Sequence, residues 1–270
     1  MTIEAETKIL KDEGTVRLSS IIIQRSQSRF SKMFGKTLKA GWSATDHVFI
    51  TVPSMSRSHI IQAHPFTIAS AAPHPGDHEV RMDLLIRAQE GFSRDLLNAA
   101  RLHKRLTVRI DGPYGSSHAR DVLEGSELAL LVAGGSGIAV CWPLVQHLLN
   151  ITRSSDTDLA TTRSLRRQKI VLVWIIHEGA HLSWLGRQAL AEADYQGVEI
   201  IVPQATEEAG RPDLKSMINE IVDRHTYERG QKIRCVASGP DGMGRLVRNA
   251  FASLVREGRD ADVTIEKFGW

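Results

Sequence analysis

The sequence is poor in cysteine, and it has little excess charge of either sign. Its 270 residues include two cysteines, Cys141 and Cys235. They cannot supply the disulfide framework of a small secreted domain, and neither belongs to a CxxC pair of the kind that binds zinc. Lys and Arg number 34 against 31 Asp and Glu, which gives a net charge of +3 and implies no general nucleic-acid surface. These absences predict a globular protein from a reducing compartment.

Long apolar runs are also missing. The segment between Glu127 and Arg153 carries no charged residue, and its length resembles that of a membrane span. Glycines and polar side chains dilute its hydropathy, however: Gly134, Gly135, Ser136, Gly137, Gln146, His147 and Asn150. The first residues, MTIEAETK, lack the apolar core of a signal peptide. We therefore expect a soluble, cytoplasmic protein rather than a membrane-embedded one.

The chain is long enough for about two domains, and its two parts differ in pattern. Up to about residue 120, short β-branched runs alternate with turn residues, which is typical of antiparallel strands in a small barrel. These runs are 19–23, 47–52, 66–68, 81–87 and 106–110. Residues 93–102 form an amphipathic exception, and we predict a short helix there that Ser93 caps and that covers the barrel end.

From about residue 121 the pattern changes to strands, glycine turns and helices in alternation, the signature of a parallel α/β sheet. The expected strands are the apolar runs 128–133, 170–176, 198–202 and 233–237. Residues 150–169 are polar and predict an extended surface loop, with Arg163, Arg166, Arg167 and Lys169 at its basic end. The expected fold is thus α+β with two domains, an antiparallel β-barrel in 1–120 and an α/β parallel-sheet domain in 121–270.

Two turns rich in small residues follow expected strands of the second domain. Gly134, Gly135, Ser136 and Gly137 lead into a helix from Ile138, an arrangement whose backbone N–H groups and helix dipole attract a pyrophosphate. Ser238, Gly239 and Pro240 follow the last core strand, and ligands of parallel sheets lie at this edge. Arg211, Arg166 and Arg167 are candidate cations for a 2′-phosphate. The alternatives are a glycine turn that only reverses the chain and arginines that are merely solvated.

The first domain carries the string His64-Pro-Phe-Thr-Ile-Ala-Ser70. It places an aromatic ring and two hydroxyl groups along a strand that has a rigid proline near its start. With Arg87 and the Gly91-Phe-Ser93 segment, hydroxyl and amide donors gather near a cation, which suits a diphosphate. From composition alone, the same string is also consistent with an ordinary edge strand.

Six motifs occur in the order found in the cytosolic dehydrogenase region of ferric-chelate reductases and NADPH oxidases, which is similar in fold to ferredoxin-NADP reductase. They are His64-Pro-Phe-Thr67, Arg87-Ala-Gln-Glu-Gly-Phe-Ser93, Gly112-Pro-Tyr-Gly115, Val132-Ala-Gly-Gly-Ser-Gly-Ile138, Gly210-Arg-Pro212 and Glu266-Lys-Phe-Gly-Trp270. The resemblance runs from about residue 14 to the C-terminus. It implies an FAD-binding domain in 1–120 and an NAD(P)-binding domain in 121–270.

The resemblance also implies roles for individual residues. The flavin and its ribityl phosphate would contact His64, Pro65, Phe66 and Thr67, with Ser70 nearby. The FAD diphosphate would lie at Arg87, Gly91, Phe92 and Ser93. The NADPH pyrophosphate would lie at Gly134, Gly135, Ser136, Gly137 and Ile138, with Arg211 near the adenosine end. Ser238, Gly239 and Pro240 would adjoin the nicotinamide, and Phe268 and Trp270 would lie near the flavin ring, with Trp270 as its lid.

Two departures from the family pattern concern the nucleotide. Ser238 stands where the family has a cysteine beside the nicotinamide, a change expected to slow hydride transfer without abolishing binding. His177 follows the Val173-Trp-Ile-Ile176 run where many relatives have arginine, which weakens the case for 2′-phosphate recognition. NADPH is therefore the expected donor, with NADH as an alternative.

The resemblance implies an oxidoreductase that passes a hydride from NADPH to FAD and then electrons to an acceptor, either a haem-bearing membrane domain or a ferric chelate. This would place the chain in the cytoplasm or at the cytosolic face of a membrane. A different class of function, a non-catalytic flavin- or nucleotide-binding regulatory module, is the alternative, and Ser238 and His177 favour it. Several histidines lack metal-ligand spacing and are interpreted as surface or loop residues, so no metal is expected: His59, His74, His78, His118, His181 and His225.

Overall fold

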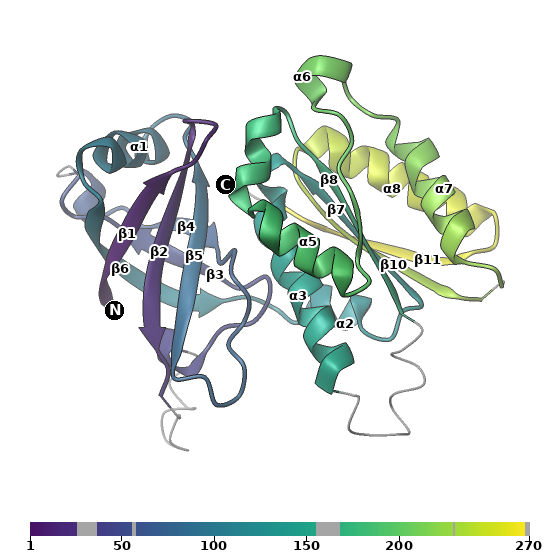
Figure 1. The fold of residues 1–270 in the computed structure, drawn as a ribbon, viewed down its shortest axis with the longest axis horizontal. Coiled ribbons are helices and arrows are strands. Elements are labelled where there is room, and N and C mark those ends of the chain that lie inside the picture. The colour runs from purple at the N-terminus through teal and green to yellow at the C-terminus, as the bar shows by residue number, and fades with distance from the viewer. Residues whose placement is uncertain (26–36, 56–57, 155–167, 229, 268–270) are drawn as a thin grey trace. The chain divides into compact units, whose positions relative to one another are not determined.

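The computed structural model describes residues 1–25, 37–55, 58–154, 168–228 and 230–267 (Figure 1). The chain divides into two compact units, Met1–Ser116 and Ser117–Trp270. Each unit has its own sheet and its own buried core.

The first unit is an antiparallel sheet of six strands in the order β4-β3-β6-β1-β2-β5. The strands are β1 (Thr2–Ile9), β2 (Thr15–Ile23), β3 (His47–Thr51), β4 (His64–Thr67), β5 (Glu79–Arg87) and β6 (Arg105–Tyr114). A bridge between Ile68 and Leu84 joins the end of β4 to β5, and the N–H of Ala69 donates to the carbonyl of Asp83 at 2.8 Å. The two edge strands therefore meet, and the sheet closes into the expected barrel.

Alternating burial explains these strands. Along β6, Leu106, Val108 and Ile110 are buried, while the residues between them are exposed, as expected when one face of a sheet covers a core. The helix α1 (Phe92–Leu102) adds Phe92 and Leu96 to the same core. Short 3-10 turns lie at η2 (Leu38–Ala40) and η3 (Ser58–Ile60).

The second unit is a parallel sheet of five strands in the order β11-β10-β7-β8-β9. The strands are β7 (Leu128–Gly134), β8 (Lys169–Ile175), β9 (Glu199–Ile201), β10 (Lys232–Ser238) and β11 (Asp260–Glu266). The helices are α2 (His118–Leu123), α3 (Ile138–Ser154), α5 (Arg187–Tyr195), α6 (Thr206–Ala209), α7 (Leu214–His225) and α8 (Asp241–Arg256), with 3-10 turns at η4 (Gly135–Gly137) and η6 (Gly179–Trp184).

Helices cover both faces of this sheet. The helices α7 and α8 pack on one face, where they share a core with alternate residues of β7, β8 and β10, and α3 packs against the same three strands from the opposite face (Figure 1). All seven residues of β7 are buried, which accounts for the uncharged sequence before the glycine turn. The uncharged window is thus the strand β7, the turn η4 and most of α3, as its glycines indicated.

Two local predictions were wrong. Ser93 does not cap α1, because the helix begins one residue earlier, after Gly91, whose φ of 62° favours glycine. Residues 150–154, expected to start a surface loop, belong to the last turn of α3. The remainder of that expected loop, 155–167, with Arg163, Arg166 and Arg167, lies outside the described residues. Lys169 opens β8, and its Nζ lies 3.8 Å from Oε2 of Glu199.

Candidate cofactor sites

The strand β4 and the start of α1 come together in the first unit. The imidazole of His64 stacks on the ring of Phe92, with centroids 4.1 Å apart, and Phe66 lies 6.0 Å from the same ring. All four residues of β4 are only partly buried, so part of His64, Pro65, Phe66 and Thr67 reaches solvent. The fold thus joins two sequence-predicted segments into one partly exposed surface.

The N-terminal turn of α1 is open to a ligand. A Cβ added at Gly91 would meet no atom within 4 Å, and the first N–H groups of a helix lack intrahelical partners. The hydroxyl of Ser93 accepts from the N–H of Gln89 at 3.0 Å. Arg87, at the end of β5, is exposed. The first N–H groups of the helix and the Arg87 guanidinium are donors, and they suit an anionic ligand.

Ser70 lies just beyond β4 and has a structural partner. Its hydroxyl accepts the N–H of Asp83 at 3.1 Å, next to the bridge that closes the barrel. The structure thus shows Ser70 in barrel closure.

A histidine and a carboxylate that the sequence did not single out support this surface. Nε2 of His59 lies 2.8 Å from Oδ2 of Asp95, in the first turn of α1, and the His59 ring packs edge-on against Phe92. His59 is 5% exposed, so the surface part of its interpretation as a surface or loop residue was wrong. Its partner lies far away in sequence, and no local pattern could have revealed the pair.

His64 carries a buried polar atom without a partner. Its Nε2 is buried and makes no hydrogen bond to any described residue. Burial, and to a lesser degree the nearby His59, lowers the pKa of His64, so the ring is neutral near pH 7. An unsatisfied buried polar atom is costly unless a ligand or water completes it. This atom therefore fits a site that receives a polar group of a cofactor such as FAD.

In the second unit the two small-residue turns touch. A Cβ at Gly137 would lie 1.9 Å from the carbonyl oxygen of Ser238, and a Cβ at Gly239 would lie 2.9 Å from Cα of Gly134. The turns follow β7 and β10, which are neighbours in the sheet. Glycine is therefore required where the two backbones meet, at the carboxyl edge where parallel sheets bind their ligands.

The turn after β7 leaves space beside this contact. Gly135 has a φ of 53°, and a Cβ there would meet nothing within 4 Å. Ser136 is partly exposed, while Ile138 is buried and begins α3, a long helix whose positive dipole end faces the turn. Open backbone at a helix N-terminus fits the pyrophosphate of a nicotinamide nucleotide.

Ser238 is fully buried, and its hydroxyl donates to the carbonyl of Glu266 at 2.8 Å. This bond links β10 to the end of β11, and Nζ of Lys267 lies 3.2 Å from Oδ1 of Asp241. Phe268 and Trp270 lie outside the described residues. Pro240 directly precedes α8, and the sulfur of Met243 lies 2.7 Å from the Cβ position of Gly134.

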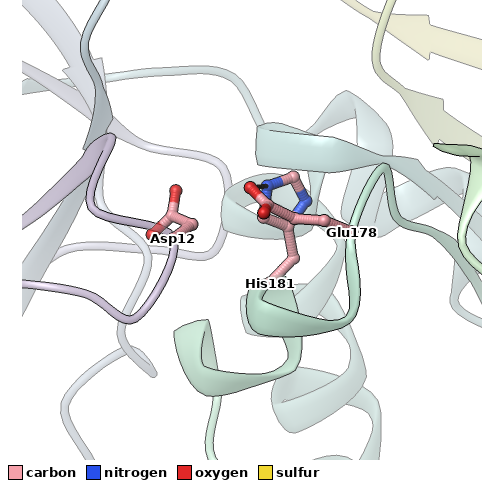
Figure 2. Close-up of side chains that lie close together, drawn as sticks. All are labelled: Asp12, Glu178 and His181. Atoms are coloured by element: carbon pink, nitrogen blue, oxygen red, sulfur yellow. Dashed lines mark ion pairs between the residues drawn. The ribbon is translucent and has the colours of Figure 1, made fainter.

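Two candidate residues for the adenosine end are exposed. Nδ1 of His177, just after β8, lies 3.1 Å from Oγ1 of Thr206. Arg211 lies between α6 and α7 and is exposed. Figure 2 shows the next pair along the chain, Glu178 and His181. Oε1 of Glu178 lies 3.2 Å from Nε2 of His181. His181 is buried, so its interpretation as a surface or loop residue was also wrong.

Comparison with known proteins gives matches in both units. Residues 21–118 match a model described as an FAD-binding domain, and residues 126–202 match one described as the ferric reductase NAD binding domain. A ferric/cupric reductase transmembrane component from Saccharomyces cerevisiae is 30% identical over 56% of this chain and 21% of its own length. Ferric reduction oxidase 2 from Arabidopsis thaliana is 28% identical over 66% of this chain and 23% of its own length.

Solved structures share the fold. A ferredoxin-NADP+ reductase from Plasmodium falciparum superposes with a TM-score of 0.60 at 11% identity, covering 99% of this chain and 96% of that one. A flavohemoglobin from Malassezia yamatoensis gives 0.59 at 13% identity, covering 99% and 60%.

The fold is that of ferredoxin-NADP reductase, and the two matched regions are described as domains that bind FAD and a nicotinamide nucleotide. The chain thus pairs a region similar to an FAD-binding domain with a region similar to the NAD binding domain of ferric reductases. It spans less than a quarter of the length of these yeast and plant relatives. Within the part of the chain that the structure describes, none of the helices combines the length and apolar content of a membrane span.

Proposed function

We propose that this chain transfers reducing equivalents from NADPH to FAD in the first unit and onward to a ferric chelate or to haem in a membrane domain. The observation that carries the proposal is the pairing of an FAD-binding domain and a ferric reductase NAD-binding domain in one chain. The names of the yeast and plant relatives support a ferric acceptor. The words "transmembrane component" in the yeast relative's name support a place at a membrane, and we propose that the chain lies at its cytosolic face.

The chain's own groups bind and orient the two cofactors. His64, Phe66 and Thr67 would lie along the flavin and its ribityl chain, while Arg87 and the start of α1, from Gly91 to Ser93, would hold the diphosphate. The open turn at Gly135 and Ser136 would hold the nucleotide pyrophosphate, with Arg211 and His177 at the adenosine end. Bound FAD would accept a hydride from the nicotinamide and release electrons singly.

A spectrum of the purified protein tests this function. We expect absorbance near 450 nm from bound FAD, bleaching on addition of NADPH without oxygen, and recovery of the colour when ferric citrate is added. A colourless protein that takes up no FAD would contradict the proposal. A yellow protein that NADPH and NADH both fail to bleach would favour the alternative, a non-catalytic flavin- or nucleotide-binding regulatory module.

Ser238 is proposed to lie beside the nicotinamide. The family that this chain resembles has a cysteine at this position, and a hydroxyl is less polarisable than a thiol. We therefore expect Ser238→Cys to increase the rate of FAD reduction at saturating NADPH and to leave the nucleotide affinity unchanged. Stopped-flow absorbance at 450 nm measures the rate. An unchanged rate would remove Ser238 from the reacting centre.

Trp270 is proposed to shield the flavin ring until the nucleotide displaces it. Deleting 268–270 should then relax the preference between NADPH and NADH and shift the flavin spectrum. Steady-state kinetics with both donors measure the preference. Unchanged preference and an unchanged spectrum would show that the C-terminal residues have no such role.

A further inference from the structure

Trp174, in β8, reaches across to the glycine turn that follows β7. Its side chain is fully buried, and its indole N–H donates to the carbonyl oxygen of Gly135 at 3.1 Å. The same oxygen also accepts the N–H of Ile138 at the start of α3. Two donors from different elements therefore fix the direction of one carbonyl group.

This direction determines where the neighbouring N–H points. The carbonyl of Gly135 and the N–H of Ser136 belong to one peptide unit, and in a trans peptide they point to opposite sides. With the oxygen held toward the indole, the Ser136 N–H points away from β8. Gly135, with its positive φ and open Cβ position, allows this orientation, which an ordinary residue would strain.

Other aromatic rings fix the indole in turn. Trp184 in η6 lies with its ring centroid 6.3 Å from that of Trp174, and His181 stacks on Trp184 at 4.2 Å. All three rings are buried, so the donor to Gly135 has little freedom to move. The segment after β8 thus backs the glycine turn.

We propose that Trp174 is a positioning residue for the nucleotide pyrophosphate. Its indole N–H sets the peptide between Gly135 and Ser136 so that the Ser136 N–H can donate to the phosphate oxygens. The inference rests on the proposed function of this turn. A role in packing alone is the competing explanation, and the two differ in whether the loss of the N–H affects pyrophosphate-bearing ligands selectively.

Trp174→Phe removes the N–H and retains an aromatic ring. Calorimetric titration of the FAD-loaded protein would compare 2′-phospho-ADP-ribose, which contains the pyrophosphate, with 2′-AMP, which lacks it. If the wild-type protein prefers NADH, the two ligands are instead ADP-ribose, which contains the pyrophosphate, and adenosine, which lacks it. One lost hydrogen bond corresponds to about a three- to tenfold weaker affinity, and we expect that loss for the pyrophosphate ligand alone. KM for the nucleotide should rise by the same factor, with kcat unchanged.

Trp184→Phe is the matched control, because it makes the same change in the same ring cluster, while the N–H that donates to Gly135 belongs to Trp174. It should leave both affinities at the wild-type value. If Trp174→Phe folds poorly, 3-benzothienylalanine at position 174 keeps the shape of the indole without a donor and should give the same selective loss.

Three results would overturn the inference: wild-type affinities in both position-174 variants, equal losses for both ligands, or an equal loss in Trp184→Phe. Failure of the wild type to bind either ligand is a separate result. It would refute the proposed nucleotide site itself, and the role of Trp174 with it.

Discussion

Gly137 occupies the tightest contact between the two turns of the nucleotide-binding unit. A methyl group there would lie 1.9 Å from the carbonyl oxygen of Ser238, and backbone cannot yield as a flexible side chain can. Gly137→Ala should therefore lower the free energy of unfolding by about 1–3 kcal/mol and weaken nucleotide binding. Urea denaturation and nucleotide titration measure the two effects.

Gly242 provides the control for this substitution. It lies in the first turn of α8, and a Cβ there would meet no atom within 4 Å. Because alanine is the better helix former, Gly242→Ala should be neutral or slightly stabilising. Equal effects of the two substitutions would show that the contact at Gly137 is not decisive.

Ser238 stabilises the sheet through its hydroxyl. Ser238→Ala removes the donor to Glu266 and should lower the free energy of unfolding by about 1–3 kcal/mol, because the Glu266 carbonyl loses its partner in a partly buried place. Ser253→Ala, which removes an exposed hydroxyl that bonds Glu257, should change it by less than about 0.5 kcal/mol. Urea denaturation compares them, and a Ser238 variant as stable as Ser253→Ala would contradict the prediction.

The glycine turns were predictable from the sequence because each follows a strongly apolar run, and a strand, a glycine turn and a helix form one local pattern. The contact between Gly137 and Ser238 was not predictable in detail, because it depends on β10 lying beside β7 in the sheet. The partner of the Ser238 hydroxyl likewise depends on β11, a strand that was not predicted because two aspartates interrupt its apolar residues.

At the level of elements, His64 links β4 to α1, because its imidazole stacks on the ring of Phe92. The pKa of His64 is lowered in the folded protein, chiefly by burial, so the unfolded chain takes up this proton first as the pH falls through about 6.5. Between that pH and the lower folded pKa, the unfolded state binds more protons than the folded state. The free energy of unfolding therefore decreases as the pH falls through this range. The contribution is fully present above about pH 6.5 and decreases below it.

We therefore expect His64→Gln to make the free energy of unfolding less dependent on pH below about 6.5. Urea denaturation at a series of pH values gives the slope. The control is His74→Gln, because His74 is an exposed histidine of the same unit, and it should keep the wild-type slope. His59, whose ring centroid lies 6.2 Å from that of His64, and its partner Asp95 remain in both variants. Equal slopes in His64→Gln and the wild type would be inconsistent with this assignment.

Element type was easier to predict than element boundaries. The helix at α1 was expected from its apolar spacing, yet its start was misplaced, because Gly91 adopts a conformation that ends the preceding loop. The strand β1 was missed because Glu4, Glu6 and Lys8 interrupt its apolar residues. These three side chains lie on the exposed face of the strand. The run 128–133 was clear because both faces of a parallel sheet are buried.

Over the whole molecule, the two buried cores lie in different units. One core draws on buried residues from Ala5 to Ile110 and the other on residues from Leu128 to Leu254. Each sheet takes all of its strands from one unit. Because the hydrophobic effect scales with the apolar area buried, each unit has its own source of folding free energy.

We expect residues 1–116 and 117–270, expressed separately, to fold and to divide the two ligands. The first fragment should bind FAD and become yellow, and the second should bind the nucleotide without colour. The control is the fragment 1–90, which lacks α1 and β6 and should not fold, because β6 pairs with both β1 and β3. Circular dichroism and thermal unfolding test folding, and equilibrium dialysis tests binding.

If the intact chain holds FAD and both fragments are unfolded, the two cores depend on each other. If the second fragment takes up FAD, the flavin belongs to the parallel sheet, and the assignment of cofactors to units is reversed.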